Sequence, residues 1–172
     1  MLAVCATLLL TAAPAQAVQR KPAHRPAAKA AVQPAGTDAY LAANARQRGV
    51  VQTASGLQYR VLAAGAGTAK PGNDDVALVN YVGKLTNGTT FDQSAQPTPM
   101  PVAGVVPGFS EALKAMPKGA KYRVWIKPSL GYGDVASGPI PAGSVLVFDI
   151  ELLDFISAAQ FQQLQQQARP AN

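Results

Sequence analysis

The chain has 172 residues, which is enough for one domain with a buried core and too few for two. Its formal net charge is +6, yet the segment from Thr53 to Phe155 carries eight basic and eight acidic residues and is neutral. The excess comes from seven basic residues outside that segment, opposed only by Asp38: Arg20, Lys21, Arg25, Lys29, Arg46, Arg48 and Arg169. This distribution favours a solvated basic arm on a neutral domain and argues against specific nucleic-acid binding.

Cysteine and histidine are almost absent from the sequence. The single cysteine is Cys5 and the single histidine is His24, and both precede the neutral segment. An internal disulfide, a cysteine-based or histidine-based metal site and a histidine-dependent catalytic triad are therefore excluded from the domain. We expect a protein that uses no metal ion and no cofactor.

The first residues are interpreted as an export signal. Leu2–Ala13 is apolar but too short to span a bilayer, and Ala-Gln-Ala at 15–17 is a small-x-small cleavage site. Residues 1–17 are therefore predicted to be a signal peptide, with the periplasm as the expected destination and the cell surface or medium as alternatives. The usual positive charge ahead of the apolar run is missing, which suggests that the true start lies upstream. Lipidation at Cys5 is disfavoured because Val4 is bulky for that processing.

The next two segments lead into the domain. Residues 18–37 are rich in Pro, Ala, Lys and Arg without apolar periodicity, which predicts a disordered linker. Residues 38–52 are predicted to be a short helical lead-in, with Thr37 or Asp38 as the helix cap and Gly49 as its stop.

Residues 53–155 then show the two-residue alternation of short strands. The first strand alternates at Leu57, Tyr59 and Val61, and the second runs from Val76. Asn-Gly at 87–88 predicts a tight turn before a third strand. Two later strands alternate as well, KYRVWIK and SVLVFDIELLDF, with Trp125 on the polar, exposed face of the first of them.

One short helix interrupts the strands. Pro-Gly at 107–108 opens it, Phe109, Leu113 and Met116 recur at helical spacing, and Pro117 ends it. The sequence therefore predicts an α+β domain in which a curved antiparallel sheet of about five strands wraps around one helix. Residues 156–172 form a Gln-rich tail, predicted to be a frayed helix or disordered.

The stretch from Phe91 to Phe109 has the composition of a binding pocket. It places Phe91 and Asp92 at one end and three apolar residues at the other, so a folded loop gathers apolar side chains around one carboxylate. Four prolines make it a poor central strand. An ordinary loop that packs its own aromatic side chains remains the alternative interpretation.

Five separated segments, in order, resemble the FKBP-type peptidyl-prolyl cis-trans isomerases: VNYVGKLTNGTTFD, VVPGFSEAL, GYG, IP and LVFDIELLDF. The resemblance covers residues 53–155. The preceding NARQRGVVQTASGLQYRVL is similar to the lead-in of the secreted bacterial branch, the macrophage infectivity potentiator proteins.

This resemblance implies an enzyme that rotates X-Pro bonds in exported polypeptides, without a cofactor. It implies a proline pocket with catalytic positions at Tyr81, Phe91, Asp92, Tyr132 and Phe148, and with substrate-binding positions at Val105, Val106, Phe109 and Ile140. The Tyr132 hydroxyl and the Val106 N–H are expected to bond substrate carbonyls, and Asp92 to orient the site. Phe109 stands where the family most often has tryptophan.

The sequence also departs from the family pattern. The loop after Asp92 lacks about three residues, including a basic residue and a phenylalanine, so we expect weaker affinity for macrolide inhibitors. Only a short helix precedes the domain, which predicts a monomer. A binding module that holds Pro-containing or unfolded segments without catalysis is the alternative function.

Overall fold

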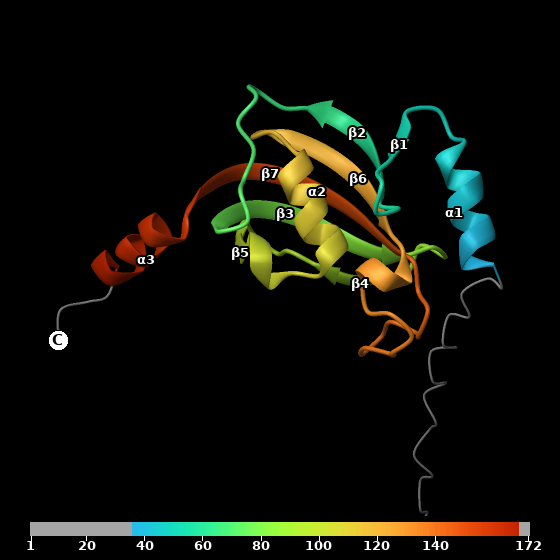
Figure 1. The fold of residues 1–172 in the computed structure, drawn as a ribbon. Coiled ribbons are helices and arrows are strands. Elements are labelled where there is room, and N and C mark those ends of the chain that lie inside the picture. Colours follow the sequence, from blue (N-terminus) through green and yellow to red (C-terminus); the bar gives the residue numbers. More distant parts are fainter. Residues whose placement is uncertain (1–35, 169–172) are drawn as a thin grey trace, which may run out of the picture.

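The computed structural model describes residues 36–168 (Figure 1). The expected signal peptide, the linker before Gly36, Cys5 and His24 lie outside the described residues, as do residues 169–172.

The described chain forms one antiparallel sheet of seven strands in the order β1-β2-β6-β7-β3-β4, with β5 also paired to β3. The strands are β1 (Val50–Gln52), β2 (Gln58–Ala64), β3 (Asp75–Leu85), β4 (Thr90–Gln93), β5 (Thr98–Pro101), β6 (Ala120–Ile126) and β7 (Leu146–Ser157). The helices are α1 (Thr37–Ala45), α2 (Pro107–Ala115) and α3 (Ala158–Gln167), with short 3-10 turns η1 (Val102–Gly104) and η2 (Pro128–Leu130). The predicted α+β class is confirmed.

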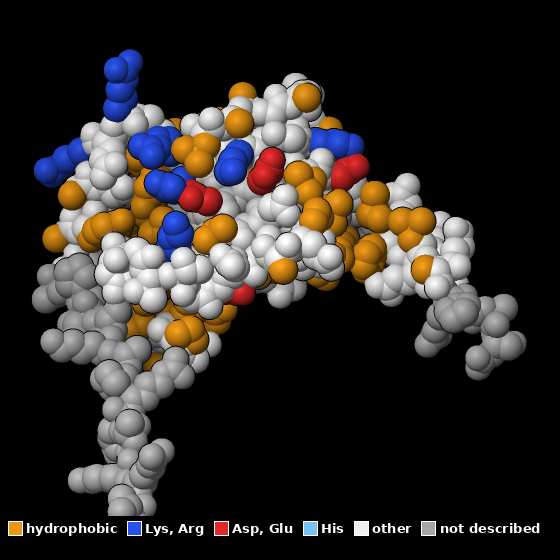
Figure 2. Space-filling model, turned by 180° about the vertical axis from the view of Figure 1, so that it is seen from behind, with side chains coloured by type: hydrophobic (Ala, Val, Ile, Leu, Met, Phe, Trp, Pro, Cys, Tyr) orange, Lys and Arg blue, Asp and Glu red, His pale blue; other side chains and the backbone are white. Residues whose placement is uncertain are grey.

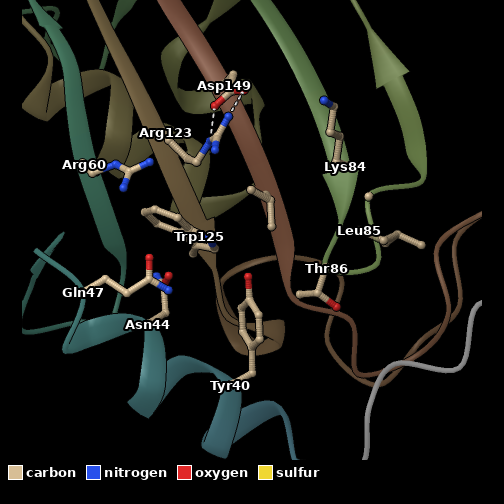
Figure 3. A pocket seen from close by; sticks show the side chains of 12 residues that line it. Tyr40, Asn44, Gln47, Arg60, Lys84, Leu85, Thr86, Arg123, Trp125 and Asp149 are labelled. Atoms are coloured by element: carbon tan, nitrogen blue, oxygen red, sulfur yellow. Dashed lines mark hydrogen bonds and ion pairs between the residues drawn. The ribbon is translucent and has the colours of Figure 1, made fainter. Parts of the chain in front are cut away.

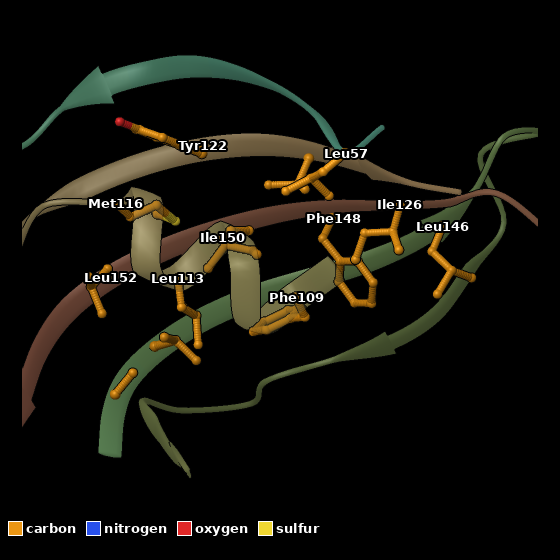
Figure 4. Packing of buried hydrophobic residues seen from close by; sticks show 14 of the residues in the cluster. Leu57, Phe109, Leu113, Met116, Tyr122, Ile126, Leu146, Phe148, Ile150 and Leu152 are labelled. Atoms are coloured by element: carbon orange, nitrogen blue, oxygen red, sulfur yellow. The ribbon is translucent and has the colours of Figure 1, made fainter. Parts of the chain in front are cut away.

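The core lies between the concave face of the sheet and α2, which the sheet curves around (Figure 4). The helix begins at Pro107, whose fixed φ suits the first helical position, and it buries Phe109 and Leu113 against the sheet. It approaches the sheet closely at Gly108, where a Cβ atom would lie 2.5 Å from Ile126 Cγ2. The predicted inward residues of β7 are likewise buried: Leu146, Phe148, Ile150 and Leu152.

The central pair of strands positions the candidate site. β3 and β7 pair along their whole lengths, from Asp75 opposite Ser157 to Leu85 opposite Leu146, with one irregularity after Leu78. Strands buried within a sheet in this way are its most rigid parts. Side chains that project from the middle of β3 and β7 toward α2 therefore have well-defined positions.

The region before the domain differs from the sequence prediction. The helix is capped by the backbone of Gly36, at φ 125°, and neither Thr37 nor Asp38 caps it through its side chain. The Thr37 hydroxyl instead donates to the Gly143 carbonyl at 3.3 Å. The remainder of the predicted helical lead-in includes the strand β1.

The prediction that Trp125 is exposed is wrong. Only 5% of its surface is accessible, because α1 crosses the convex face of the sheet there and packs Leu41 and Tyr40 against it. A buried hydrogen bond of 2.8 Å from Asn44 Nδ2 to Gln58 Oε1 ties the helix to β2. A short helix with only two large apolar side chains, Tyr40 and Leu41, can cover an indole that sequence alternation assigns to the solvent side.

The strand β5 was not predicted, since two of its four residues are prolines, Pro99 and Pro101. It pairs with β3 on one side only. At such an edge position a proline is tolerated because its missing N–H can face away from the neighbouring strand.

The tail is helical in its described part. α3 begins with a capping box in which the Gln160 N–H donates to the Ser157 hydroxyl at 3.2 Å and the Ser157 N–H donates to the Gln160 side chain at 3.1 Å.

Among residues 36–168, no helix is long and apolar enough to cross a membrane.

Candidate active site

A cavity of about 380 Å³ opens between the sheet, α2 and the loops at one end of the helix. Its size falls at the lower end of the range for small-molecule sites. Residues from four strands, from α2 and η1 and from two loops line it: Tyr81, Asp92, Met100, Gly104, Val105, Val106, Phe109, Tyr132 and Phe148. The lining is apolar and aromatic, and Asp92 is its only carboxylate.

Aromatic rings pack edge to face around Phe148 at the base of this cavity. The ring centroid of Phe109 lies 5.1 Å from that of Phe148, and the ring of Phe91 lies 5.5 Å from it, both nearly perpendicular. Tyr81 meets Phe109 in the same way at 6.0 Å. Such pairs stabilise a cluster beyond simple burial, by about 0.5–1.5 kcal/mol each. The base of the cavity is therefore a preformed aromatic surface.

Tyr81 and Asp92 form the polar pair of the site. The Tyr81 hydroxyl donates a hydrogen bond of 2.8 Å to Asp92 Oδ2. Burial, followed by this hydrogen bond and the nearby carboxylate charge, raises the pKa of Tyr81 to about 12. The phenol thus stays protonated at physiological pH and donates to the carboxylate.

Ser94 fixes the backbone from which Tyr81 projects. The Tyr81 N–H donates to Ser94 Oγ at 2.9 Å, and the Ser94 N–H donates back to the Tyr81 carbonyl at 3.0 Å. The strand β4 ends directly before Ser94, and it pairs with β3 with Asp92 opposite Gly83. These bonds hold Tyr81 and Asp92 at the distance that their side-chain hydrogen bond requires.

Val105 and Val106 form the wall at the start of α2. Val106 is the helix N-cap residue, and its carbonyl accepts from the N–H groups of Phe109 and Ser110 at 2.9 and 3.0 Å. Its own N–H makes no hydrogen bond with residues 36–168. The first N–H groups of a helix lack intrahelical partners, so this end of α2 offers a donor.

Tyr132 reaches the cavity from the loop after η2 and keeps 42% of its surface exposed. The loop is held by hydrogen bonds from the N–H groups of Gly131 and Gly133 to the Pro128 carbonyl, at 2.9 and 2.8 Å. Gly133 adopts φ 62°, which is left-handed backbone that glycine tolerates best. The phenol thus projects from an anchored turn.

Two of the sequence-predicted site residues lie outside the cavity lining. Phe91 is half-buried and packs behind the cavity against Phe148. Ile140 is only 5% exposed and belongs to the main core, where its backbone pairs with Ser137. The other seven predicted residues line the same cavity.

Sequence reasoning missed Met100 and Gly83. Met100 lines the cavity from β5, and its position within Pro-Met-Pro hid the alternation that would have pointed it inward. Gly83 lies beneath the aromatic cluster, where a Cβ atom would lie 2.7 Å from Phe148 Cε1 and 2.8 Å from Phe91 Cζ. A glycine within a predicted strand is the signal of such a close approach.

The raised pKa of Tyr81 predicts an alkaline loss of stability. Because the folded state holds the phenolic proton more tightly, its contribution is present below the unfolded pKa of about 10 and is lost as pH rises from about 10 to about 12. We expect the difference in unfolding free energy between the parent and Tyr81→Phe to shrink over this range. Urea titrations at a series of pH values measure it, and a difference independent of pH would contradict the assignment.

Comparison with known proteins finds the same fold, an aromatic cavity between a curved sheet and one helix, in one family. Residues 67–153 match the family model of FKBP-type peptidyl-prolyl cis-trans isomerases, and residues 8–61 match the domain amino-terminal to such isomerases. The chain belongs to the FKBP-type peptidyl-prolyl cis-trans isomerase family.

Individual relatives agree with this placement. The chain is 48% identical over 117 residues to the FKBP-type isomerase FkpA of Aeromonas hydrophila, covering 66% of this chain and 43% of the relative. It is 41% identical over 126 residues to the outer membrane protein MIP of Legionella longbeachae, covering 71% and 54%. The predicted resemblance to the macrophage infectivity potentiator branch is confirmed.

Solved structures show the same fold. The crystal structure of FkpA from Escherichia coli matches with a TM-score of 0.70 and 40% identity, over 75% of this chain and 62% of that one. An isomerase from Pseudomonas syringae matches with a TM-score of 0.67 and 36% identity, over 70% and 90%. The chain spans about half the length of the curated relatives that it matches.

Proposed function

We propose that this protein is a peptidyl-prolyl cis-trans isomerase that acts on Pro-containing polypeptides. The observation that carries the proposal is the cavity of about 380 Å³, in which an aromatic base and two valines surround a single carboxylate. Membership of the isomerase family supports it. The cavity is large enough to hold a prolyl ring, and it is open, so the polypeptide on either side of that ring can continue outside.

The chemistry required is rotation without bond cleavage. Resonance holds the X-Pro amide planar behind a barrier of about 18–20 kcal/mol, and the twisted amide is less charge-separated than the planar one. Transfer into an apolar cup removes water that supports the planar form and thereby favours the twisted form. Phe109 and Phe148 supply the surface of this cup, and Phe91 supports it from behind.

Hydrogen-bond donors complete the proposed mechanism. The Val106 N–H and the Tyr132 hydroxyl bond substrate carbonyls and hold the chain while the amide rotates. Asp92 accepts from Tyr81 and orients the aromatic base. It needs no role as a general acid or base, because the rotation transfers no proton.

A protease-coupled assay on a Leu-Pro or Phe-Pro peptide tests this function. We expect the full chain to accelerate cis-to-trans exchange beyond the uncatalysed rate, which takes tens to hundreds of seconds. Binding of the peptide without acceleration would instead support a module that only holds Pro-containing segments.

Tyr132→Phe tests the donor on the loop. Removing one hydrogen bond to the substrate is expected to lower kcat/KM by about twofold to tenfold, corresponding to about 0.5–1.5 kcal/mol. Tyr59→Phe is the matched control, since Tyr59 stacks on Tyr122 at 5.3 Å, outside the cavity. Equal activity of the parent and Tyr132→Phe would remove Tyr132 from the mechanism.

Export and a monomeric state belong to the same proposal. The apolar segment and the small-x-small site at residues 15–17 support an exported protein that acts on exported clients, with the periplasm as its compartment. α1 has nine residues, which is a short surface for pairing with a second copy, and we propose a monomer. Sedimentation at micromolar concentration checks this, and a mass of twice the chain would contradict it.

Reduced affinity for macrolide inhibitors is proposed from the cavity lining. Between Asp92 and Val105 only Met100 and Gly104 line the cavity, so the wall is built from small or flexible residues there. A large rigid ligand gains less contact from such a wall than from an aromatic one.

A further inference from the structure

A second cavity, of about 300 Å³, lies on the convex face of the sheet and shares no residue with the candidate active site (Figure 3). One side is formed by Tyr40 and Asn44 of α1 and by Gln47 in the turn that follows it, and the other by the turn between β3 and β4. Trp125 and Val147 lie between these walls. We call this the convex cavity.

Three cationic side chains line the convex cavity, against one carboxylate. Arg60 and Arg123 are directly opposite each other on β2 and β6, and Arg123 is in turn opposite Asp149 on β7. Lys84 lines the cavity from β3. Seen from behind, basic side chains gather on the part of this face nearer α1 (Figure 2). Like charges directly opposite on neighbouring strands are destabilising, so the Arg60–Arg123 pair is an unfavourable arrangement for stability alone.

The single carboxylate is already paired. Arg123 donates to Asp149 through Nε and Nη2 at 2.6 and 2.7 Å, and these hydrogen bonds, aided by the charges of Arg123, Lys84 and Lys121, lower the pKa of Asp149. Lys121 in turn lies opposite Glu151 on β7. Among the described residues, neither Arg60 nor Lys84 makes an ion pair. The convex cavity therefore has a surplus of about two positive charges.

The cationic groups are held in place and remain accessible. The Arg60 guanidinium lies 6.0 Å from the centre of the Trp125 ring, a favourable cation–π position. Both Arg60 and Lys84 are half-buried, and the Arg123 side chain keeps 37% of its surface exposed. A guanidinium fixed in this way loses little freedom when it binds an anion, which strengthens binding.

We propose that the convex cavity binds a carboxylate side chain of an acidic polypeptide segment. The cationic end matches the carboxylate, while the half-buried Tyr40 ring and the small accessible part of Trp125 provide the apolar surface against which the stem of a glutamate can pack. Ligand sites commonly span about 300–1,000 Å³, and this cavity lies at the lower end of that range. Its volume therefore suits a ligand as small as one or two side chains.

Fluorescence of Trp125 measures this binding at the proposed place, because it is the only tryptophan of the chain and lines the cavity. The full chain is titrated with a tetraglutamate peptide and with a tetraglutamine peptide. We expect saturable quenching or a spectral shift with tetraglutamate only, weakening as salt is added. The double variant Arg60→Gln/Lys84→Gln is expected to bind about tenfold more weakly.

The control variant is Lys70→Gln/Lys114→Gln, which removes the same charge at two exposed lysines outside the cavity. It is expected to bind like the parent, and both variants should keep the parent's isomerase activity and circular dichroism spectrum. If both double variants bind tetraglutamate equally well, the proposal is overturned. Both variants keep the basic residues before the domain, so equal binding would mean that the peptide does not depend on Arg60 and Lys84. Equal affinity for inorganic phosphate, or for tetraglutamine, would also overturn the assignment to an acidic polypeptide.

Discussion

Phe91→Ala is expected to lower kcat/KM for an X-Pro peptide more than any change at a hydrogen-bonding group of the cavity. The ring supports Phe148 from behind at 5.5 Å, so its loss lets the base of the cup relax and admits water. We expect the loss of this ring to cost the transition state about 1.5–3 kcal/mol, the value of burying one large apolar side chain, which corresponds to about tenfold to a hundredfold in kcat/KM. The protease-coupled assay measures the effect.

The matched control for this change is Phe161→Ala. Phe161 is half-buried on α3 and lines an apolar cavity with Phe155 and Leu164, away from the candidate active site. We expect its removal to leave kcat/KM unchanged. If Phe91→Ala is folded by circular dichroism and fully active, the desolvation mechanism is wrong.

Gly83→Ala is expected to destabilise the protein by about 1–3 kcal/mol and to reduce its activity. The added methyl group would lie 2.7 Å from Phe148 and 2.8 Å from Phe91, so both rings must move. Since these rings form and support the base of the cup, stability and kcat/KM should fall together. Urea denaturation and the isomerase assay on the same sample measure both quantities.

Gly72→Ala serves as the control for Gly83→Ala. Its added methyl group would meet only the Asp75 side chain, with Oδ2 at 3.5 Å and Cγ at 4.0 Å, which are ordinary contacts. We expect no loss of stability or activity there. A Gly83→Ala variant as stable as Gly72→Ala would show that the two rings have room to shift.

The parts of the fold that sequence predicts well are those in which one face is buried and the other solvated. Alternation in β7 and in β6 places Phe148 and Val124 inward, and helical spacing places Phe109 and Leu113 against the sheet. The three residues of β1 carry too little pattern, and two of the four residues of β5 are prolines, so both strands were missed. The burial of Trp125 depends on α1, a contact between distant segments that no local pattern contains.

The candidate site shows the same division. Aromatic and valine residues near one carboxylate in sequence are brought to one cavity, as composition and family resemblance predict. Gly83 and Ser94 act through packing and backbone hydrogen bonds, which depend on the register of β3 with β4. Register is decided by the assembled sheet, so these supporting residues become visible only in the structure.

The prolines of β5 have a consequence for how an extended polypeptide can meet this protein. An antiparallel strand directs the N–H groups of alternate residues to either side, and Pro99 and Pro101 have none to direct outward. An incoming chain therefore finds no row of donors with which to extend the sheet beside the cavity. If the proposed function holds, we expect polypeptides to be held at this border through their side chains, without main-chain hydrogen bonds to β5.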